Sequence, residues 1–164
     1  MASVKYFDGL NYILGKKKIV ESLDIFAYTS RTYCACIRDA DIVIKKVRLL
    51  VYKPRSSTEG RSMHASKFGV DNDTISFWKD MSKNKKILSL EIKYFDFEST
   101  YHFALIDNKY YHFGFYLIKS ERPGYSLLTS FSSPDDVSIE TECFRNDFHT
   151  IFENYFSNYA YSSE

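Results

Sequence analysis

The chain has 164 residues and a formal net charge of +1, and 45% of its residues are hydrophobic. This length suits one continuous core, so we expect a single domain over residues 1–164. The small net charge gives no general attraction to nucleic acid or anionic lipid, so binding either would need a local patch. The apolar runs are far shorter than the roughly 20 residues of a membrane helix. Residues 1–10 lack the apolar centre of a secretory signal, so we expect neither a membrane segment nor secretion.

The three cysteines also indicate an intracellular protein. Cys34, Cys36 and Cys143 form no CxxC pair, and the first two are too close in sequence for an ordinary disulfide. We expect all three to be small core residues in a reducing, cytoplasmic environment.

The first predicted elements are a helix, a strand and a second helix. Residues 5–21 place apolar side chains at nearly helical spacing, which predicts a helix that ends near Ser22. The run 23–29 is almost wholly apolar, as in a central strand covered on both faces. Ser30 or Thr32 can cap the helix that follows. The inward side of that helix is expected to carry Tyr33, Cys36, Ile37 and Ala40.

The composition changes in the middle of the chain. Residues 46–53 predict a second strand, which Pro54 ends. Residues 55–72 are polar and predict a loop whose length is typical of functional or disordered segments. A short helix is expected to begin at Asp73 or Thr74.

Strands dominate the next part of the sequence. We predict them at residues 87–95, 101–107 and 110–117. The last two are separated by Asn108 and Lys109, a length typical of a tight hairpin, so this pair is expected to be antiparallel.

The chain is predicted to close with an edge strand at residues 125–131 and a helix from Ile139. Parallel pairing early in the chain and antiparallel pairing later predict an α/β (α+β) fold, in which helices flank a mixed β-sheet. The apolar stripe of the last helix is read as core packing. Its members are Phe144, Phe148, Ile151, Phe152, Tyr155 and Phe156.

The four histidines are the first candidates for chemistry. His102 and His112 lie on the two strands of the predicted hairpin, where cross-strand neighbours approach closely. Two histidines without a nearby cysteine or paired carboxylates are a weak metal signature, so we expect no metal and no cofactor. His64 and Lys67 lie in the polar loop and have no fixed geometry. His149 is expected at the margin of the last helix's apolar stripe.

The hairpin also carries a family resemblance. The segment ALIDNKYYHFGFY, followed by the helix FRNDFHTIFENYFSNYA, resembles one half of a phospholipase D superfamily domain. In that family an apolar strand ends in an aspartate, and a glycine follows about seven residues later, as Asp107 and Gly114 do here. The family's closing helix often carries a pattern such as FENYF, and an early strand like VRLLVYKP also fits. The resemblance implies a phospholipase D-like half-domain over most of the chain.

The family's reactive residues are not intact. The active motif is H-x-K-x(4)-D, in which histidine attacks phosphorus and lysine stabilises the phosphoryl charge. When the motif is aligned on Asp107, the histidine position is Thr100 and the lysine position is His102. When His102 is taken as the nucleophile, Ala104 replaces the lysine and Lys109 replaces the aspartate. The catalytic candidates Thr100, His102 and Asp107 therefore form a degenerate motif.

The resemblance leaves two main hypotheses. The first is a pseudoenzyme, a non-catalytic phospholipase D-like module for binding, sensing or assembly. Because active members of the family join two half-domains, the resemblance implies that this chain forms a homodimer. The alternative is a divergent nuclease or phosphodiesterase that uses His102. A third possibility is an interaction protein whose exposed tyrosines, as in the C-terminal run NYFSNYAYSSE, bind a partner. The residues that would bind a phosphate-containing, nucleotide or nucleic-acid ligand are His102, Thr100, Lys109, His112 and Ser30.

Overall fold

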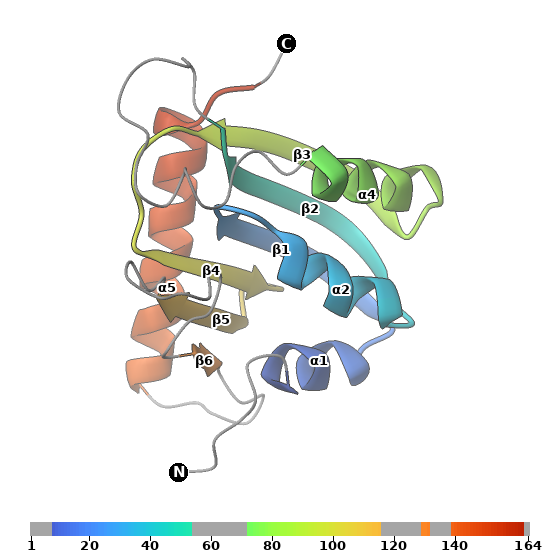
Figure 1. Cartoon of the computed structure of the whole chain (residues 1–164). Helices are drawn as coiled ribbons and strands as arrows, with labels where there is room; N and C mark the ends of the chain where they lie inside the picture. The colour runs from blue at the N-terminus through green and yellow to red at the C-terminus, as the bar shows by residue number, and fades with distance from the viewer. Residues whose placement is uncertain (1–7, 54–71, 116–128, 132–138, 163–164) are drawn as a thin grey trace, which may run out of the picture.

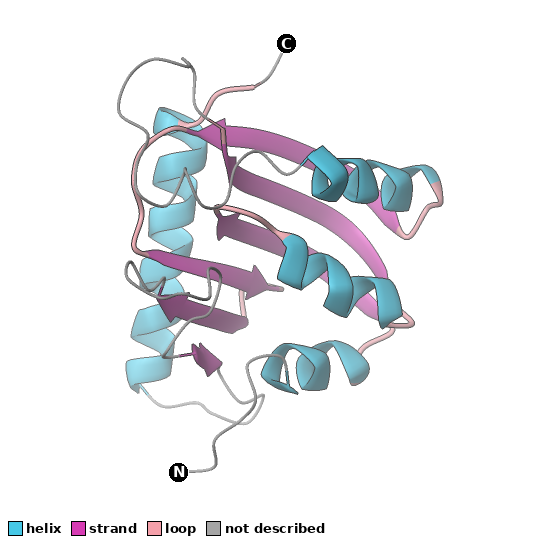
Figure 2. Cartoon of the chain, in the orientation of Figure 1, coloured by secondary structure: helices cyan, strands magenta, loops and turns pink. Residues whose placement is uncertain are grey.

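The computed structural model describes residues 8–53, 72–115, 129–131 and 139–162. A six-stranded sheet lies between α1, α2 and α4 on one face and α5 on the other (Figures 1 and 2). The elements are α1 (Asp8–Gly15), β1 (Ile19–Ala27), α2 (Arg31–Asp39), β2 (Val43–Tyr52), α4 (Asn72–Lys83), β3 (Ile87–Phe95), β4 (Tyr101–Ile106), β5 (Tyr110–Phe115), β6 (Thr129–Phe131), α5 (Ile139–Asn154) and a π-helical turn, Tyr155–Tyr159.

The sheet is mixed, which confirms the predicted α/β fold. Its strand order is β3-β2-β1-β4-β5-β6. The strands β1, β2 and β3 are parallel to one another, and β4 pairs antiparallel with β1 and with β5. β6 adds a short antiparallel edge. The strand β1 therefore stands where parallel pairing changes to antiparallel pairing. No helix in the described part of the chain has the length and apolar character of a membrane span.

Several element boundaries differ from the sequence predictions. The predicted first helix reaches Ser22, whereas α1 ends at Gly15 and the chain is already a strand at Ile19. Residues 19–22 extend because they pair with the start of β2, which itself begins at Val43 rather than at residue 46. The predicted edge strand is found at residues 129–131. Parts of three predicted elements lie outside the described residues. They are the polar loop at 55–71 with His64 and Lys67, the end of the predicted hairpin strand at 116–117 and the start of the predicted edge strand at 125–128.

The two faces of the sheet are chemically different. The face under α1, α2 and α4 is largely aliphatic, with Leu23, Ile25 and Leu49 among its buried residues. The face under α5 is largely aromatic, and Phe144 is 53% exposed rather than part of the predicted stripe. Cys143 is likewise exposed, so the expectation of a core position is wrong for this cysteine. The buried phenylalanines of the aromatic face are Phe26, Phe95, Phe103, Phe148, Phe152 and Phe156.

The described C-terminal residues pack against the edge strand β3. Tyr161 exchanges two backbone hydrogen bonds with Tyr94, of 2.8 and 2.9 Å, and its hydroxyl donates to the carbonyl oxygen of Lys53. Lys93 donates to the carbonyl oxygen of Phe156. These contacts attach the end of the chain to the sheet, while Tyr159 remains 55% exposed.

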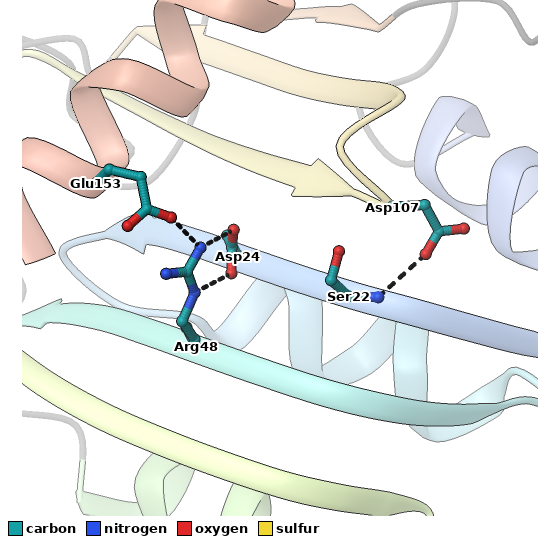
Figure 3. A network of polar contacts seen from close by, with 5 residues as sticks. All are labelled: Ser22, Asp24, Arg48, Asp107 and Glu153. Carbon is teal, nitrogen blue, oxygen red and sulfur yellow. Dashed lines mark hydrogen bonds and ion pairs between the residues drawn. The ribbon is translucent and has the colours of Figure 1, made fainter.

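One ionic network joins α5 to the sheet (Figure 3). Arg48 of β2 donates two hydrogen bonds to Asp24 of β1, at 2.7 and 2.6 Å, and a third to Glu153 of α5 at 2.6 Å. Its guanidinium lies 4.9 Å from the Phe152 ring centroid and 5.5 Å from that of Phe156. The two carboxylates raise the pKa of Arg48, so the side chain stays charged. Because Asp24 is 2% exposed, Arg48 is required to balance its charge.

Replacement of Arg48 should therefore destabilise the protein strongly. We expect Arg48→Met to lower the free energy of unfolding by about 3–5 kcal/mol, because Asp24 would keep a buried carboxylate without its cation. Glu153→Gln removes the more exposed acid of the same network and should cost less than about 1 kcal/mol. Urea denaturation measures both values. Equal losses in the two variants would contradict this account.

Candidate functional site

The two hairpin histidines lie side by side on one face of β4 and β5. In the register of the hairpin, His102 is opposite Gly114 and His112 is opposite Ala104. The histidines are thus diagonal neighbours, and their ring centroids are 5.8 Å apart. Each imidazole faces a residue with little or no side chain, so the pair fits beneath α2.

Tyr33 of α2 connects the two imidazoles. Its hydroxyl oxygen lies 3.1 Å from Nδ1 of His102 and 3.1 Å from Nδ1 of His112. A tyrosine hydroxyl donates one hydrogen bond and accepts others. When both imidazoles are neutral, one Nδ1 accepts the tyrosine proton and the other Nδ1 carries a proton that it donates to the oxygen. The two histidines are therefore expected to hold opposite tautomers.

Burial keeps His102 uncharged. His102, His112 and Tyr33 are 3%, 2% and 1% exposed, respectively. Loss of solvation lowers the pKa of His102 to about 3, with a further contribution from His112. At neutral pH His102 is consequently a neutral imidazole, closed in by Tyr33 and His112 inside the aliphatic core.

Asp107 is engaged in a different task at the hairpin turn. Its carboxylate accepts hydrogen bonds from the backbone amides of Glu21 at 2.7 Å and Ser22 at 3.1 Å, the latter drawn in Figure 3. Lys17 forms an ion pair with it at 2.6 Å. Asp107 and Asn108 have φ angles of 56° and 50°, so the first two residues of the three-residue turn 107–109 between β4 and β5 are left-handed. The aspartate therefore fixes the turn to the start of β1.

The other predicted site residues are spread over the molecule. Thr100 and Asp107 flank opposite ends of β4, about 20 Å apart at a strand rise of about 3.3 Å per residue. Thr100 and Lys109 are exposed at those two ends. Ser30 is 1% exposed, and its hydroxyl oxygen accepts a 2.7 Å hydrogen bond from the indole of Trp78. Of the five predicted ligand-binding residues, the structure brings together His102 and His112.

Two hollows lie among the described residues near α2. The first, at the carboxyl ends of β1 and β2, has a volume of about 10 Å³, which is room for roughly one water molecule. Thr29 and Ser30 are part of its lining. The second is an open hollow of about 530 Å³ between α1 and α2, with Asp39 and Cys36 in its wall. Burial and Asp39 raise the pKa of Cys36 to about 11, so its thiol stays protonated.

In the part of the chain that the structure describes, no group of three or more histidine, cysteine, aspartate or glutamate side chains is placed to hold a metal ion. The residue that sequence reasoning did not connect to the histidines is Tyr33. Its placement on the inward side of a helix was predicted, and a buried tyrosine hydroxyl usually finds a polar partner. That requirement is the signal that could have linked it to the histidines.

The pKa of His102 predicts how stability depends on pH. The unfolded chain binds the proton near pH 6.5, whereas the folded state binds it near pH 3. The contribution of His102 to the free energy of unfolding is therefore fully present above pH 6.5. It falls by roughly 1.4 kcal/mol per pH unit between pH 6.5 and about pH 3. His102→Asn retains a polar partner for Tyr33 but cannot titrate, so its stability should fall less steeply. Urea denaturation from pH 7 to pH 5 compares the two slopes, and equal slopes would contradict the lowered pKa.

Comparison with known proteins adds no relative, since no protein-family model, curated protein or solved structure matches the chain.

Proposed function

We propose that this chain is a non-catalytic module that resembles a phospholipase D half-domain and acts by assembling with another protein chain. The observation that carries the proposal is the burial of His102, the imidazole of the degenerate motif, beneath Tyr33. The described topology is consistent with the resemblance, since a parallel strand–helix–strand unit adjoins an antiparallel hairpin.

Catalysis by His102 would conflict with this geometry. A nucleophilic imidazole must present a nitrogen to the phosphorus atom of its substrate. His102 is 3% exposed, and its Nδ1 already contacts the hydroxyl of Tyr33. A phosphohistidine at this position would place a charged phosphoryl group in an aliphatic core, at a high desolvation cost. Thr100 is exposed, but His102, the residue that would have to act as its base, is buried.

A small phosphate ligand is also poorly served by the hollows described. The hollow beside Thr29 and Ser30 holds roughly one water molecule. The wall of the larger hollow includes Asp39, whose carboxylate would repel a phosphate. Recognition of a protein surface therefore explains the described residues better than recognition of a nucleotide. Cys34 and Cys36 are buried and form no disulfide, which agrees with the proposal of a reducing, cytoplasmic location.

A hydrolysis assay tests the proposal. The full chain is incubated with bis-p-nitrophenyl phosphate and with labelled single- and double-stranded DNA and RNA, with and without Mg²⁺, Mn²⁺ and Zn²⁺. We expect no product above the buffer blank, because the buried imidazole cannot reach a phosphodiester.

The matched control for the hydrolysis assay is His102→Asn, purified in parallel. Equal product from the two proteins identifies a contaminating nuclease. Product that the wild-type chain forms and His102→Asn does not would refute the proposal and establish the nuclease or phosphodiesterase alternative. Calorimetric titration with inorganic phosphate and with ADP should give no heat of binding.

A further inference from the structure

The three parallel strands share an irregular step near their amino-terminal ends. In a regular strand, core-facing residues recur at every second position. Here two successive core-facing residues are three positions apart in each strand. The pairs are Val20 and Leu23 in β1, Ile44 and Val47 in β2, and Ile87 and Leu90 in β3. Because Val20, Ile44 and Ile87 are neighbours across the sheet, all three strands turn one extra residue outward at the same level.

Exposed apolar residues lie within this step, at Leu88, and directly before it, at Ile19 and Val43. Ile19, Val43 and Leu88 are 53%, 40% and 60% exposed and lie on adjacent strands. Ile19 and Val43 are paired across β1 and β2. Leu88 comes directly after Ile87, which is paired with Ile44 of β2. They point away from the aliphatic core, toward the face on which α5 lies. In Figure 1, α5 crosses the sheet near the carboxyl ends of β1–β3, whereas these three residues belong to the amino-terminal parts of the strands. We call Ile19, Val43 and Leu88 the outer corner.

Charges of both signs border the outer corner. Glu21 and Lys45 form an ion pair of 2.9 Å across β1 and β2. Lys46 is exposed beside Lys45 on β2. Glu91 is exposed on β3 three residues beyond Leu88, where it lies 3.9 Å from Lys93. A surface of a single sign would repel a second copy of itself. A surface with both signs can be complementary to itself about a twofold axis, because each acid can approach a base of the other copy.

We propose that the outer corner is an isologous interface, at which two copies of this chain pack sheet face against sheet face. The three aliphatic side chains of each copy form its apolar centre, and Glu21, Lys45, Lys46 and Glu91 form its polar rim. The proposal names the partner for the assembly role proposed above and rests on that role. It leaves the cluster of Tyr33, His102 and His112 on the opposite face of the sheet, outside the interface.

Sedimentation velocity of the full chain over increasing concentration tests the interface. We expect a dimer, and we expect Leu88→Asp to raise its Kd by at least about 100-fold, because an isologous interface loses the same contact twice. Phe144→Asp is the matched control, since it places the same charge at a 53% exposed aromatic residue on α5. It should leave the Kd unchanged. A wild-type chain that is monomeric at about 100 µM, or equal dimerisation of the two variants, would overturn the proposal.

A charge-exchange experiment does not depend on the Leu88 variant being folded. Lys45→Glu/Lys46→Glu makes the rim acidic, and Glu21→Lys/Glu91→Lys makes it basic. Each double variant should self-associate weakly, while an equimolar mixture should dimerise again. A mixture that stays monomeric beside a dimeric wild-type chain refutes this interface.

The hydrolysis assay on the same proteins separates the two proposals. A monomeric, inactive chain refutes the interface alone. A chain whose phosphodiester hydrolysis depends on His102 refutes the proposed function.

Discussion

The hydroxyl of Tyr33 is the contact on which the arrangement of this molecule depends most. It lies within hydrogen-bond distance of two buried imidazoles, one from each strand of the β4–β5 hairpin, and so ties that hairpin to α2. Unsatisfied imidazoles in an aliphatic core would carry a large desolvation cost. With Tyr33 in place, Nδ1 of each imidazole has a hydrogen-bond partner, and the helix is fixed over the antiparallel half of the sheet. The same contact buries His102 and leaves it 3% exposed.

The two faces of the sheet therefore have different roles. The aliphatic face is covered by α1, α2 and α4 and holds the cluster of Tyr33, His102 and His112. The opposite face is closed by α5 through aromatic packing and through the ion pair between Arg48 of the sheet and Glu153 of α5, and it stays open at the outer corner. Buried polar groups here serve the fold, whereas the exposed aliphatic and charged groups are available to a partner. This division favours a function in assembly over one in hydrolysis.

Much of the fold could be predicted from local pattern. The antiparallel hairpin was predicted from two strands separated by Asn108 and Lys109, although Asp107 also belongs to the turn. The strand at residues 87–95 was predicted with its observed bounds. The starts of β1 and β2 were missed for a physical reason. In β1, the core-facing residues Val20 and Leu23 are three positions apart, a spacing that imitates a helix. In β2, the same spacing between Ile44 and Val47 interrupts the alternation expected of a strand. The contact of Tyr33 with the histidines depends on how α2 lies across the sheet, which no local pattern encodes.

The most direct test of the account is the protonation state of His102 in the folded protein. Nitrogen-15 NMR of the imidazole groups, with His102→Asn for assignment, follows each histidine from pH 8 to pH 5. The account predicts that His102 stays neutral throughout, since its pKa is about 3. It also predicts that Nδ1 is protonated in one of the pair His102 and His112 and unprotonated in the other. A titration of His102 with a midpoint near 6.5 would show a solvent-accessible imidazole and would contradict the closed cluster.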